Sequence, residues 1–382
     1  MVNRLISDKI RNLLGKFPVV TLTGARQCGK STLLKNLLPD YRYVSLEDPD
    51  MRRVVSEDPR SFLNNFSDKT IIDEAQYVPE LFSYIQTKVD NVNRPGMYVL
   101  SGSHNFLLME SVTQSLAGRV AILKLAPFSI SELRSAGMLP DNSYELILNG
   151  GYPRVYDWKI SPEDYYPNYV MTYLERDVRL LRNVNDFSRF ELFLRLCASR
   201  VGQQISFTAL SNECGISVQT AKDWISILES SYLVFRLSPY YKNFGKRLVK
   251  TPKLYFYDTG LVCGLVGLQT SSQLMFSDMK GALFENLVIA DVLKKNLFAG
   301  KQPQLYYWRD SNGNEVDLLE DNGGQLNAYE IKSGSSLKLD WFKGLDGFAA
   351  LSGIDTSNKS VIYGGDFNYL TESGKFVSWK EL

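Results

Sequence analysis

The chain has 382 residues, with 43 Lys or Arg against 42 Asp or Glu, so its formal net charge at pH 7 is +1. This length predicts two or three domains, and the balanced charge excludes a uniformly basic protein, so any contact with nucleic acid must come from a local patch. A single histidine, His104, excludes a zinc site with several His ligands, and four cysteines without a C-x-x-C pair favour reduced thiols in a cytoplasmic protein.

Membrane segments are not expected. No apolar run approaches the length of a membrane span, and residues 1–9 mix charges instead of building a signal peptide. We therefore expect a protein that does not contact a membrane.

The first chemical motif is a candidate phosphate-binding loop at residues 24–31, which fits the pattern G-x-x-x-x-G-K-[ST] and follows an apolar run that predicts a strand. Its two glycines let backbone N–H groups turn toward phosphate oxygens, and a helix that begins near Lys30 points its positive end at them. We predict that Lys30 reaches the β and γ phosphates of ATP and that Ser31 holds Mg²⁺. The residues expected to bind the nucleotide are Gly24, Ala25, Arg26, Gln27, Cys28, Gly29, Lys30, Ser31 and Thr32.

A second motif consists of the adjacent carboxylates Asp73 and Glu74, which end a short β-prone run. A buried strand delivers such acids to its carboxyl edge, where Asp73 would hold the hydration shell of Mg²⁺ and Glu74 would polarise the attacking water. Alone, an acidic pair after a strand is more often a solvated turn. Its place downstream of the phosphate loop, with an extra strand at residues 43–46 between them, favours the functional interpretation. This order resembles the additional-strand ATPases, of which AAA-type enzymes are the largest group.

The next two strands are expected at residues 97–100 and 120–125. In the ATPases that the order resembles, polar residues after the first of these strands sense the γ phosphate. Ser103 or Asn105 would fill this role, unless the Ser-Gly-Ser turn is ordinary loop chemistry. Arg119 directly precedes the second strand, where related ATPases place an arginine finger that often acts on a neighbouring subunit; the alternative is a surface arginine at a helix end.

A Gly-Gly-Tyr-Pro segment at residues 150–153 follows a small helical stretch. Its Gly-x-Pro resembles the element with which signal-transduction ATPases of the additional-strand class contact the nucleotide from a lid, so Pro153 is a candidate nucleotide contact. Gly-Gly-x-Pro is also a common helix terminator. Helical spacing of apolar residues then continues over residues 162–199.

Residues 207–228 predict a helix-turn-helix, because a short helix, a turn at Gly215, a cap at Ser217 and a second amphipathic helix follow one another. The second helix offers polar residues near its start, where recognition helices carry base and phosphate contacts. Many such units serve only as packing modules. The polar candidates are Ser217, Gln219, Thr220 and Lys222.

A basic segment with interleaved aromatic residues and no acid follows this unit, as in the wing of a winged helix. Such a wing suits a phosphate backbone and exposed bases, so DNA is the predicted partner. The alternative is a solvated hairpin that touches the ATPase domain or a partner protein. The basic residues are Lys242, Lys246, Arg247, Lys250 and Lys253.

The C-terminal part predicts an amphipathic helix, three strands, a helix and a last strand between residues 281 and 363. This order resembles the restriction-endonuclease-like core. Asp317 and Glu330 would grip Mg²⁺, and Lys332, which shares a strand face with Glu330, would activate water. Glu285 would add a ligand from the helix. A core of this kind need not cleave, because fold does not imply function.

Several motifs together carry a resemblance to one family over nearly the whole chain. They are the phosphate loop, Ile71-Ile-Asp-Glu-Ala-Gln76, Leu116-Ala-Gly-Arg119, Gly150-Gly-Tyr-Pro153, Lys253-Leu-Tyr-Phe-Tyr-Asp-Thr-Gly260 and Glu330-Ile-Lys-Ser-Gly334. The chain resembles prokaryotic AAA-type ATPases in which the ATPase domain is joined to a winged helix and to a C-terminal domain of unknown function with a nuclease-like fold. This resemblance implies ATP binding and hydrolysis but supplies no substrate. Cys28 departs from the family, which has an aliphatic residue there, and its thiol would make nucleotide binding sensitive to oxidation if solvent reaches it.

We therefore expect an α/β protein with a P-loop ATPase domain and its parallel sheet at residues 1–135, and a helical lid and connector at 136–200. A winged helix would follow at 201–262 and an α/β endonuclease-like domain at 263–382. The expected function is Mg²⁺-dependent ATP hydrolysis by a homo-oligomer that acts on DNA. The alternative is a nucleotide-dependent signalling switch that binds a protein partner and carries an inactive nuclease-like domain.

Overall fold

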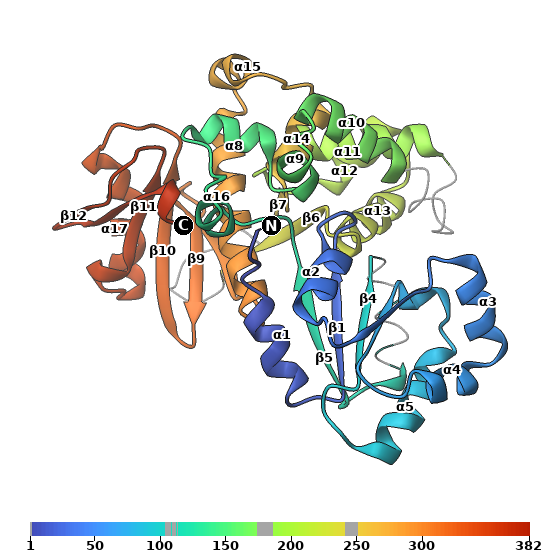
Figure 1. Cartoon of the computed structure of the whole chain (residues 1–382). Coiled ribbons are helices and arrows are strands. Elements are labelled where there is room, and N and C mark those ends of the chain that lie inside the picture. The colour runs from blue at the N-terminus through green and yellow to red at the C-terminus, as the bar shows by residue number, and fades with distance from the viewer. Residues whose placement is uncertain (1, 104–107, 109–111, 113, 174–185, 241–250) are drawn as a thin grey trace.

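The computed structural model describes residues 2–382 except 104–107, 109–111, 113, 174–185 and 241–250 (Figure 1). Its N-terminal part contains a five-stranded parallel sheet in the order β2-β3-β4-β1-β5, which confirms the predicted α/β fold class. The strands are β1 (Val19–Gly24), β2 (Arg42–Ser45), β3 (Thr70–Asp73), β4 (Tyr98–Gly102) and β5 (Val120–Leu125). The helices of this part are α1 (Ser7–Leu14), α2 (Lys30–Leu37), α3 (Pro49–Glu57), α4 (Pro59–Asn65) and α5 (Leu81–Val92).

The central strands of this sheet are mainly apolar, and every residue of β1, β3 and β4 is buried. Such continuous burial is typical of parallel strands with both faces covered. Because parallel strands end at one edge of a sheet, these strands deliver Gly24, Asp73 and Gly102 to the same edge. The motifs that the sequence places after each strand therefore meet in space.

A helical part follows the first sheet. Within it, the predicted helix-turn-helix is present as α12 and α13: Gly215 ends the first helix at φ 62°, and Ser217 Oγ accepts a hydrogen bond from the backbone N–H of Thr220 at 3.0 Å. The helices are α7 (Ile130–Ser135), α8 (Ser143–Asn149), α9 (Pro153–Asp157), α10 (Pro162–Tyr173), α11 (Phe187–Ser199), α12 (Phe207–Cys214) and α13 (Val218–Ser230).

A second, eight-stranded sheet has the order β12-β13-β11-β10-β9-β8-β6-β7. Its strands β6 and β7 come from the segment predicted as a winged helix, and β6 pairs in parallel with β8 at Ser238 and Tyr306. The boundary expected at residue 262 therefore cuts through one continuous sheet. The strands are β6 (Val234–Pro239), β7 (Lys253–Phe256), β8 (Leu305–Arg309), β9 (Glu315–Asn322), β10 (Gln325–Lys332), β11 (Lys359–Tyr363), β12 (Tyr369–Thr371) and β13 (Gly374–Ser378). The accompanying helices are α14 (Thr259–Val266), α15 (Ser271–Phe276), α16 (Lys280–Phe298) and α17 (Lys343–Ser352).

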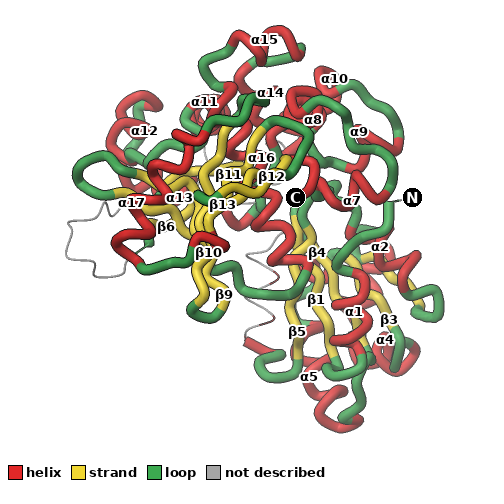
Figure 2. Tube along the Cα trace, turned by 90° about the vertical axis from the view of Figure 1, so that its left-hand side faces the viewer, coloured by secondary structure: helices red, strands yellow, loops and turns green. Residues whose placement is uncertain are grey.

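The two sheets form separate groups of strands (Figure 2), and α16 packs against elements of both, including β5 and β10. One hydrophobic core runs through all parts of the chain, since it contains Leu22 of β1, Tyr166 of α10, Leu287 of α16 and Ile331 of β10. The parts are thus joined by shared packing as well as by the chain. Of the helices within the described ranges, none combines the length and the apolar character needed to cross a membrane.

Candidate nucleotide-binding site

The phosphate loop connects β1 to α2, and its two glycines serve different physical needs. Gly29 forms the N-cap of α2 at φ 94°, a left-handed conformation that residues with a Cβ rarely adopt. At Gly24 a Cβ would lie 2.0 Å from the carbonyl oxygen of Leu125 in β5. One glycine therefore permits the turn into the helix, and the other permits close packing against the neighbouring strand.

Lys30 begins α2 and is buried, with 5% of its surface exposed. Its Nζ donates hydrogen bonds to the carbonyl oxygens of Gly24 and Ala25, each at 2.9 Å. The loop thus curls around the ammonium group at the N-terminal end of a helix. A fixed cation and a helix N-terminus at one place suit the binding of phosphate.

Asp73 ends β3 and accepts hydrogen bonds from three hydroxyl groups. Ser31 Oγ of α2 donates to Asp73 Oδ2 at 2.6 Å, and the hydroxyl of Tyr43 on β2 donates to the same oxygen. Ser101 Oγ on β4 donates to Oδ1. The structure thus brings the predicted metal residues Ser31 and Asp73 into direct contact, and their hard oxygen atoms fit Mg²⁺.

Tyr43 was not singled out in the sequence. Burial and the hydrogen bond to Asp73 raise the pKa of Tyr43 above its ordinary value. Its hydroxyl therefore keeps its proton and acts as a donor to the carboxylate. The signal that would have indicated it is its place on the extra strand, two residues before the end that lies beside Asp73.

Glu74 and Ser103, both predicted from the sequence, are hydrogen-bonded to each other. Ser103 Oγ lies 2.8 Å from Glu74 Oε1 and 3.0 Å from Oε2, and Gln76 Nε2 donates to Oε2 at 2.5 Å. Glu74 itself has φ 53°, which is uncommon for a residue other than glycine and recurs at functional sites. Asn105, the alternative to Ser103, lies outside the described residues.

A pocket of about 310 Å³ opens beside the phosphate loop. Pro153 of α9 closes one side of it, and Pro153 Cγ lies 3.7 Å from the place that a Cβ on Gly29 would take. The structure therefore puts the predicted lid proline next to the loop. A concave pocket with apolar and polar walls suits the base and sugar of a nucleotide. Its walls include Arg4, Gly29, Thr32, Leu33, Phe128 and Pro153.

Arg4 also lines this pocket, and no local sequence pattern indicates it. It is buried, and its Nη1 donates to the carbonyl oxygen of Cys28 at 3.0 Å. Its Nη2 donates to the carbonyl oxygen of Ala126 at 2.7 Å, and its Nε pairs with Glu132 at 3.0 Å. Arg4 thereby ties the N-terminal segment to the loop and to the chain that leaves β5.

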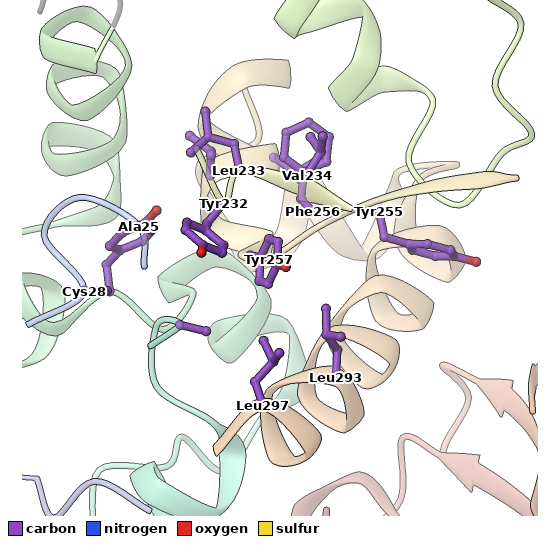
Figure 3. Packing of buried hydrophobic residues seen from close by; sticks show 14 of the residues in the cluster. Ala25, Cys28, Tyr232, Leu233, Val234, Tyr255, Phe256, Tyr257, Leu293 and Leu297 are labelled. Atoms are coloured by element: carbon purple, nitrogen blue, oxygen red, sulfur yellow. The ribbon is translucent and has the colours of Figure 1, made fainter. Parts of the chain in front are cut away.

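Cys28 is fully buried, and its Sγ lies 3.4 Å from the carbonyl oxygen of Leu125. Solvent does not reach the thiol in this arrangement, so the condition for the expected sensitivity to oxidation is not met. Figure 3 shows Cys28 and Ala25 of the loop in one buried cluster with Tyr232 and Tyr257, which belong to the chain around β6 and β7.

Two tyrosines from the helical part form hydrogen bonds with the loop region. The hydroxyl of Tyr232, just after α13, lies 2.6 Å from Thr23 Oγ1. The hydroxyl of Tyr165 in α10 donates to Gln27 Oε1 at 3.0 Å. The phosphate loop is therefore linked by side chains both to the helix-turn-helix and to the helices of the lid.

The Gly-Gly pair before Pro153 is part of a buried junction around Asp258. The backbone N–H of Gly151 donates to Asp258 Oδ2 at 2.6 Å, and the hydroxyl of Tyr166 donates to Oδ1 at 2.8 Å. A Cβ on Gly150 would lie 2.1 Å from the Tyr166 hydroxyl oxygen. Gly150 also ends α8. The pair therefore ends a helix and also permits the contact with Asp258.

Arg119 lies at the edge of the first sheet that is opposite the phosphate loop. In the register of β1 and β5, Val19 pairs with Val120 whereas Gly24 pairs with Leu125, so about 17 Å of strand separate the two ends. Arg119 Nη2 lies 2.9 Å from Oδ2 of Asp90 on α5, in an exposed ion pair. Any finger role would consequently be toward a neighbouring subunit.

The predicted ligands of a second metal site, Glu285, Asp317 and Glu330, lie near one another on α16, β9 and β10. Burial and the carboxylates of Glu285 and Glu330 raise the pKa of Asp317 well above its ordinary value. Asp317 Oδ2 accepts the N–H of Ile331 at 2.8 Å, and Lys332 Nζ donates to Glu330 Oε1 at 2.5 Å. Across the residues that the structure describes, no three His, Cys, Asp or Glu side chains form a group that could hold a metal ion. Metal binding at this cluster stays a prediction.

Lys253 corrects part of the predicted basic segment. It is 5% exposed, and its Nζ pairs with Glu285 Oε1 at 3.1 Å and with Glu315 Oε1 at 2.5 Å. Burial opposes its charged form, but these two carboxylates outweigh burial and raise the pKa of Lys253. Its charge is used inside the protein and does not face a phosphate backbone. The other basic residues of the segment lie outside the described residues.

The start of α13 carries the polar residues expected of a recognition helix on the surface. Ser217, Gln219 and Lys222 are exposed. Ser217 caps the helix, and Gln219 Nε2 donates to Asp223 Oδ1 at 2.9 Å. This end of the helix is therefore accessible to a partner.

Comparison with known proteins divides the chain into three matched regions. Residues 16–134 match the model of an AAA domain. Residues 140–272 and 280–382 match two domains of unknown function, DUF8612 and DUF4143. The first region, which contains the phosphate loop, Asp73 and the parallel sheet, is thus similar to AAA domains.

Two protein sequences and two solved structures are similar to large parts of this chain. The uncharacterized proteins Mb2031c of Mycobacterium bovis and Rv2008c of Mycobacterium tuberculosis are each 28% identical over 367 residues, which are 94% of this chain and 80% of theirs. The Walker-type ATPase PABY2304 of Pyrococcus abyssi has a TM-score of 0.47 and 16% identity, over 68% of this chain and 94% of its own. The RuvB Holliday junction branch migration motor of Thermotoga maritima has a TM-score of 0.32 and 16% identity, over 62% of this chain and 90% of its own.

Proposed function

We propose that the chain is a Mg²⁺-dependent ATPase whose site consists of the phosphate loop, Asp73 and Glu74. The observation that carries this proposal is the 2.6 Å hydrogen bond from Ser31 Oγ to Asp73 Oδ2. In P-loop ATPases this pair of groups holds the metal ion that accompanies the nucleotide.

Each residue of the site has a chemical role in this proposal. Lys30 and the N-terminus of α2 would bind the β and γ phosphates, and Ser31 and Asp73 would hold Mg²⁺, which would neutralise phosphate charge. Glu74 would orient and deprotonate the attacking water. The carboxylate oxygens of Glu74 accept hydrogen bonds from Ser103 and Gln76. At least one of these oxygens must lose such a bond before it can accept the proton of the water.

Steady-state ATP hydrolysis by the wild type, Lys30→Ala and Glu74→Gln tests the proposal. We expect Lys30→Ala to lose nucleotide binding and turnover together. Glu74→Gln should retain binding and lose turnover by about 10²-fold or more, as is typical when a general base is removed. Turnover that is equal in all three proteins would contradict the proposal.

We further propose that this ATPase acts on DNA as a homo-oligomer. The exposed polar residues at the start of α13 and the basic composition of residues 242–250 support contact with DNA. The place of Arg119, remote from the loop of its own chain, supports assembly. Turnover measured with single-stranded, duplex and branched DNA tests this, with Lys30→Ala as the blank. Stimulation by DNA in the wild type is the expected result.

A nucleotide switch that binds a protein partner is the second candidate. The hydrogen bonds that link Tyr232 and Tyr165 to the loop favour it, since they would transmit the nucleotide state to the helical part. The ion pairs of Lys253 with Glu285 and Glu315 favour an inactive nuclease-like domain in this candidate. Slow turnover that is indifferent to DNA, together with DNA left intact in Mg²⁺ or Mn²⁺, would support the switch over the ATPase that acts on DNA.

A further inference from the structure

Tyr43 stands out because its hydroxyl donates to the same carboxylate oxygen as the hydroxyl of Ser31, which is a predicted magnesium ligand. The hydroxyls of Tyr43 and Ser31 both donate to Asp73 Oδ2, and Ser101 donates to Oδ1. Strand β3 lies between β2 and β4, so the carboxylate of Asp73 is held from both neighbouring strands. Tyr43 precedes Ser45, the register partner of Asp73, by two residues and therefore lies on the same face of the sheet.

The number of acceptor directions on a carboxylate oxygen makes this arrangement informative. Each oxygen offers about two such directions, and the hydroxyls of Tyr43 and Ser31 take both directions on Asp73 Oδ2. When the hydroxyl of Ser31 turns to a metal ion, one direction becomes available. The hydroxyl of Tyr43 keeps the other, and Ser101 continues to hold Oδ1.

The ring of Tyr43 is itself held in place. Lys35 Nζ lies 3.8 Å from the centroid of the ring, within the range of a cation–π contact. Lys35 follows Ser31 by one helical turn of α2, so the ring packs against the same helix that carries the phosphate loop. The tyrosine is thus fixed relative to both Asp73 and Ser31.

We infer that Tyr43 is a positioning residue for the magnesium site. Its hydroxyl orients Asp73 so that a single acceptor direction of Oδ2 is left for the water shell of the metal. This inference rests on the proposed binding of Mg²⁺ and ATP. It goes further by stating that Tyr43 strengthens binding of the metal–nucleotide complex and leaves binding of the free nucleotide unchanged. Hydrogen bonds to charged groups are strong enough for such an effect to be measurable.

The test is calorimetric binding of a non-hydrolysable ATP analogue, once with Mg²⁺ and once with EDTA. Tyr43→Phe removes the hydroxyl and keeps the ring. We expect its affinity to fall about ten-fold in Mg²⁺ and to equal that of the wild type in EDTA. Ser101→Ala, which removes the donor to Oδ1, should show the same metal-specific loss.

Tyr41→Phe is the matched control, since the hydroxyl of Tyr41 donates to the carbonyl oxygen of Gly96 at 2.8 Å. It should bind as the wild type does in both conditions. Suppose that the wild type binds the analogue more tightly with Mg²⁺ than with EDTA. If Tyr43→Phe then has the affinity of the wild type in Mg²⁺, or loses as much affinity in EDTA as in Mg²⁺, the inference is overturned and the proposed function stands. A wild type that does not bind the analogue would overturn both.

Discussion

The hydroxyl oxygen of Tyr232 lies 2.6 Å from Thr23 Oγ1. This contact joins the residues just after the second helix of the helix-turn-helix to the end of strand β1, directly before the phosphate loop. Tyr232 is buried and has φ 58°, an uncommon conformation for a tyrosine. Such a conformation persists only where the surroundings fix it. A shift of the loop on nucleotide binding would therefore displace Tyr232 and with it α13.

We predict that Tyr232→Phe uncouples α13 from the nucleotide site. In the wild type, ATP analogues should change amide hydrogen exchange in residues 218–230. This change should be at least halved in Tyr232→Phe and in Thr23→Val, at saturating analogue. Thr23→Ser keeps the hydroxyl and should restore the response of the wild type. Full retention of the response in Tyr232→Phe would contradict the coupling.

A second prediction concerns Arg119 at the far edge of the first sheet. If it acts on a neighbouring subunit, specific activity should rise steeply with protein concentration. Arg119→Ala should then abolish turnover while sparing ATP binding. Arg94→Ala is the matched control, because Arg94 lies close before β4 and forms an ion pair with Asp68 at 2.6 Å. Specific activity that does not depend on concentration would speak against a role in trans.

The third prediction concerns the ion pairs of Lys253, whose side chain is only 7% exposed. Replacing it by methionine leaves Glu285 and Glu315 without this cation in a largely buried place. Loss of one partner from a buried pair costs about 3 kcal/mol or more, so we expect the midpoint of urea unfolding to fall clearly in Lys253→Met.

Lys380→Met serves as the control for Lys253→Met. Lys380 pairs with Asp366 at 2.9 Å, and the aspartate side chain is 60% exposed. Surface pairs contribute about 1 kcal/mol or less. Unfolding midpoints that move equally in the two variants would show that the pairs of Lys253 are no stronger than a surface contact.

Asp291 of α16 gives a prediction on pH. It is buried, its Oδ1 accepts the N–H of Ile130 at 2.7 Å, and its Oδ2 has no partner within the described part of the chain. Burial raises the pKa of Asp291 although Lys295 and Lys294 oppose the shift. The folded chain thus binds this proton more tightly than the unfolded chain. Its contribution to stability is complete below the unfolded pKa of about 3.9 and is lost as pH rises through the folded pKa.

Asp291→Asn retains an acceptor for Ile130 and removes the titration. In urea unfolding between pH 4 and 8, the stability of the wild type should fall relative to this variant, by at most about 1.4 kcal/mol per pH unit. Asp340→Asn at an exposed position is the control and should follow the wild type. Parallel profiles for the wild type and Asp291→Asn would refute the prediction.

The meeting of Lys30, Ser31 and Asp73 could be predicted from the sequence because the reasons are local. A motif fixes the spacing around Lys30, and parallel strands end at one edge, so acids after a strand arrive beside the loop. The strand before the loop and the strand at residues 120–125 follow from apolar runs with clear ends, as β1 and β5 confirm.

The contacts of Tyr232 and Arg4 could not be predicted in this way. Each joins segments far apart in the chain; Thr23 and Tyr232, for example, are 209 positions apart and are brought together only by tertiary packing. Lys253 shows the complementary failure, because composition grouped it with basic residues that were expected to face a partner. Lys253 is the first residue of β7, and its side chain is buried beside the carboxylates of Glu285 and Glu315.

The pairing of β6 with β8 decides how the protein can be divided in the laboratory. A fragment that starts at residue 263 would keep β8 and remove the strand beside it, leaving a row of unpaired N–H and C=O groups on a strand that is internal in the whole chain. Open edges of this kind recruit other chains and cause aggregation. Insolubility of such a piece would therefore report the missing neighbour and would say nothing about the chemistry of the C-terminal domain.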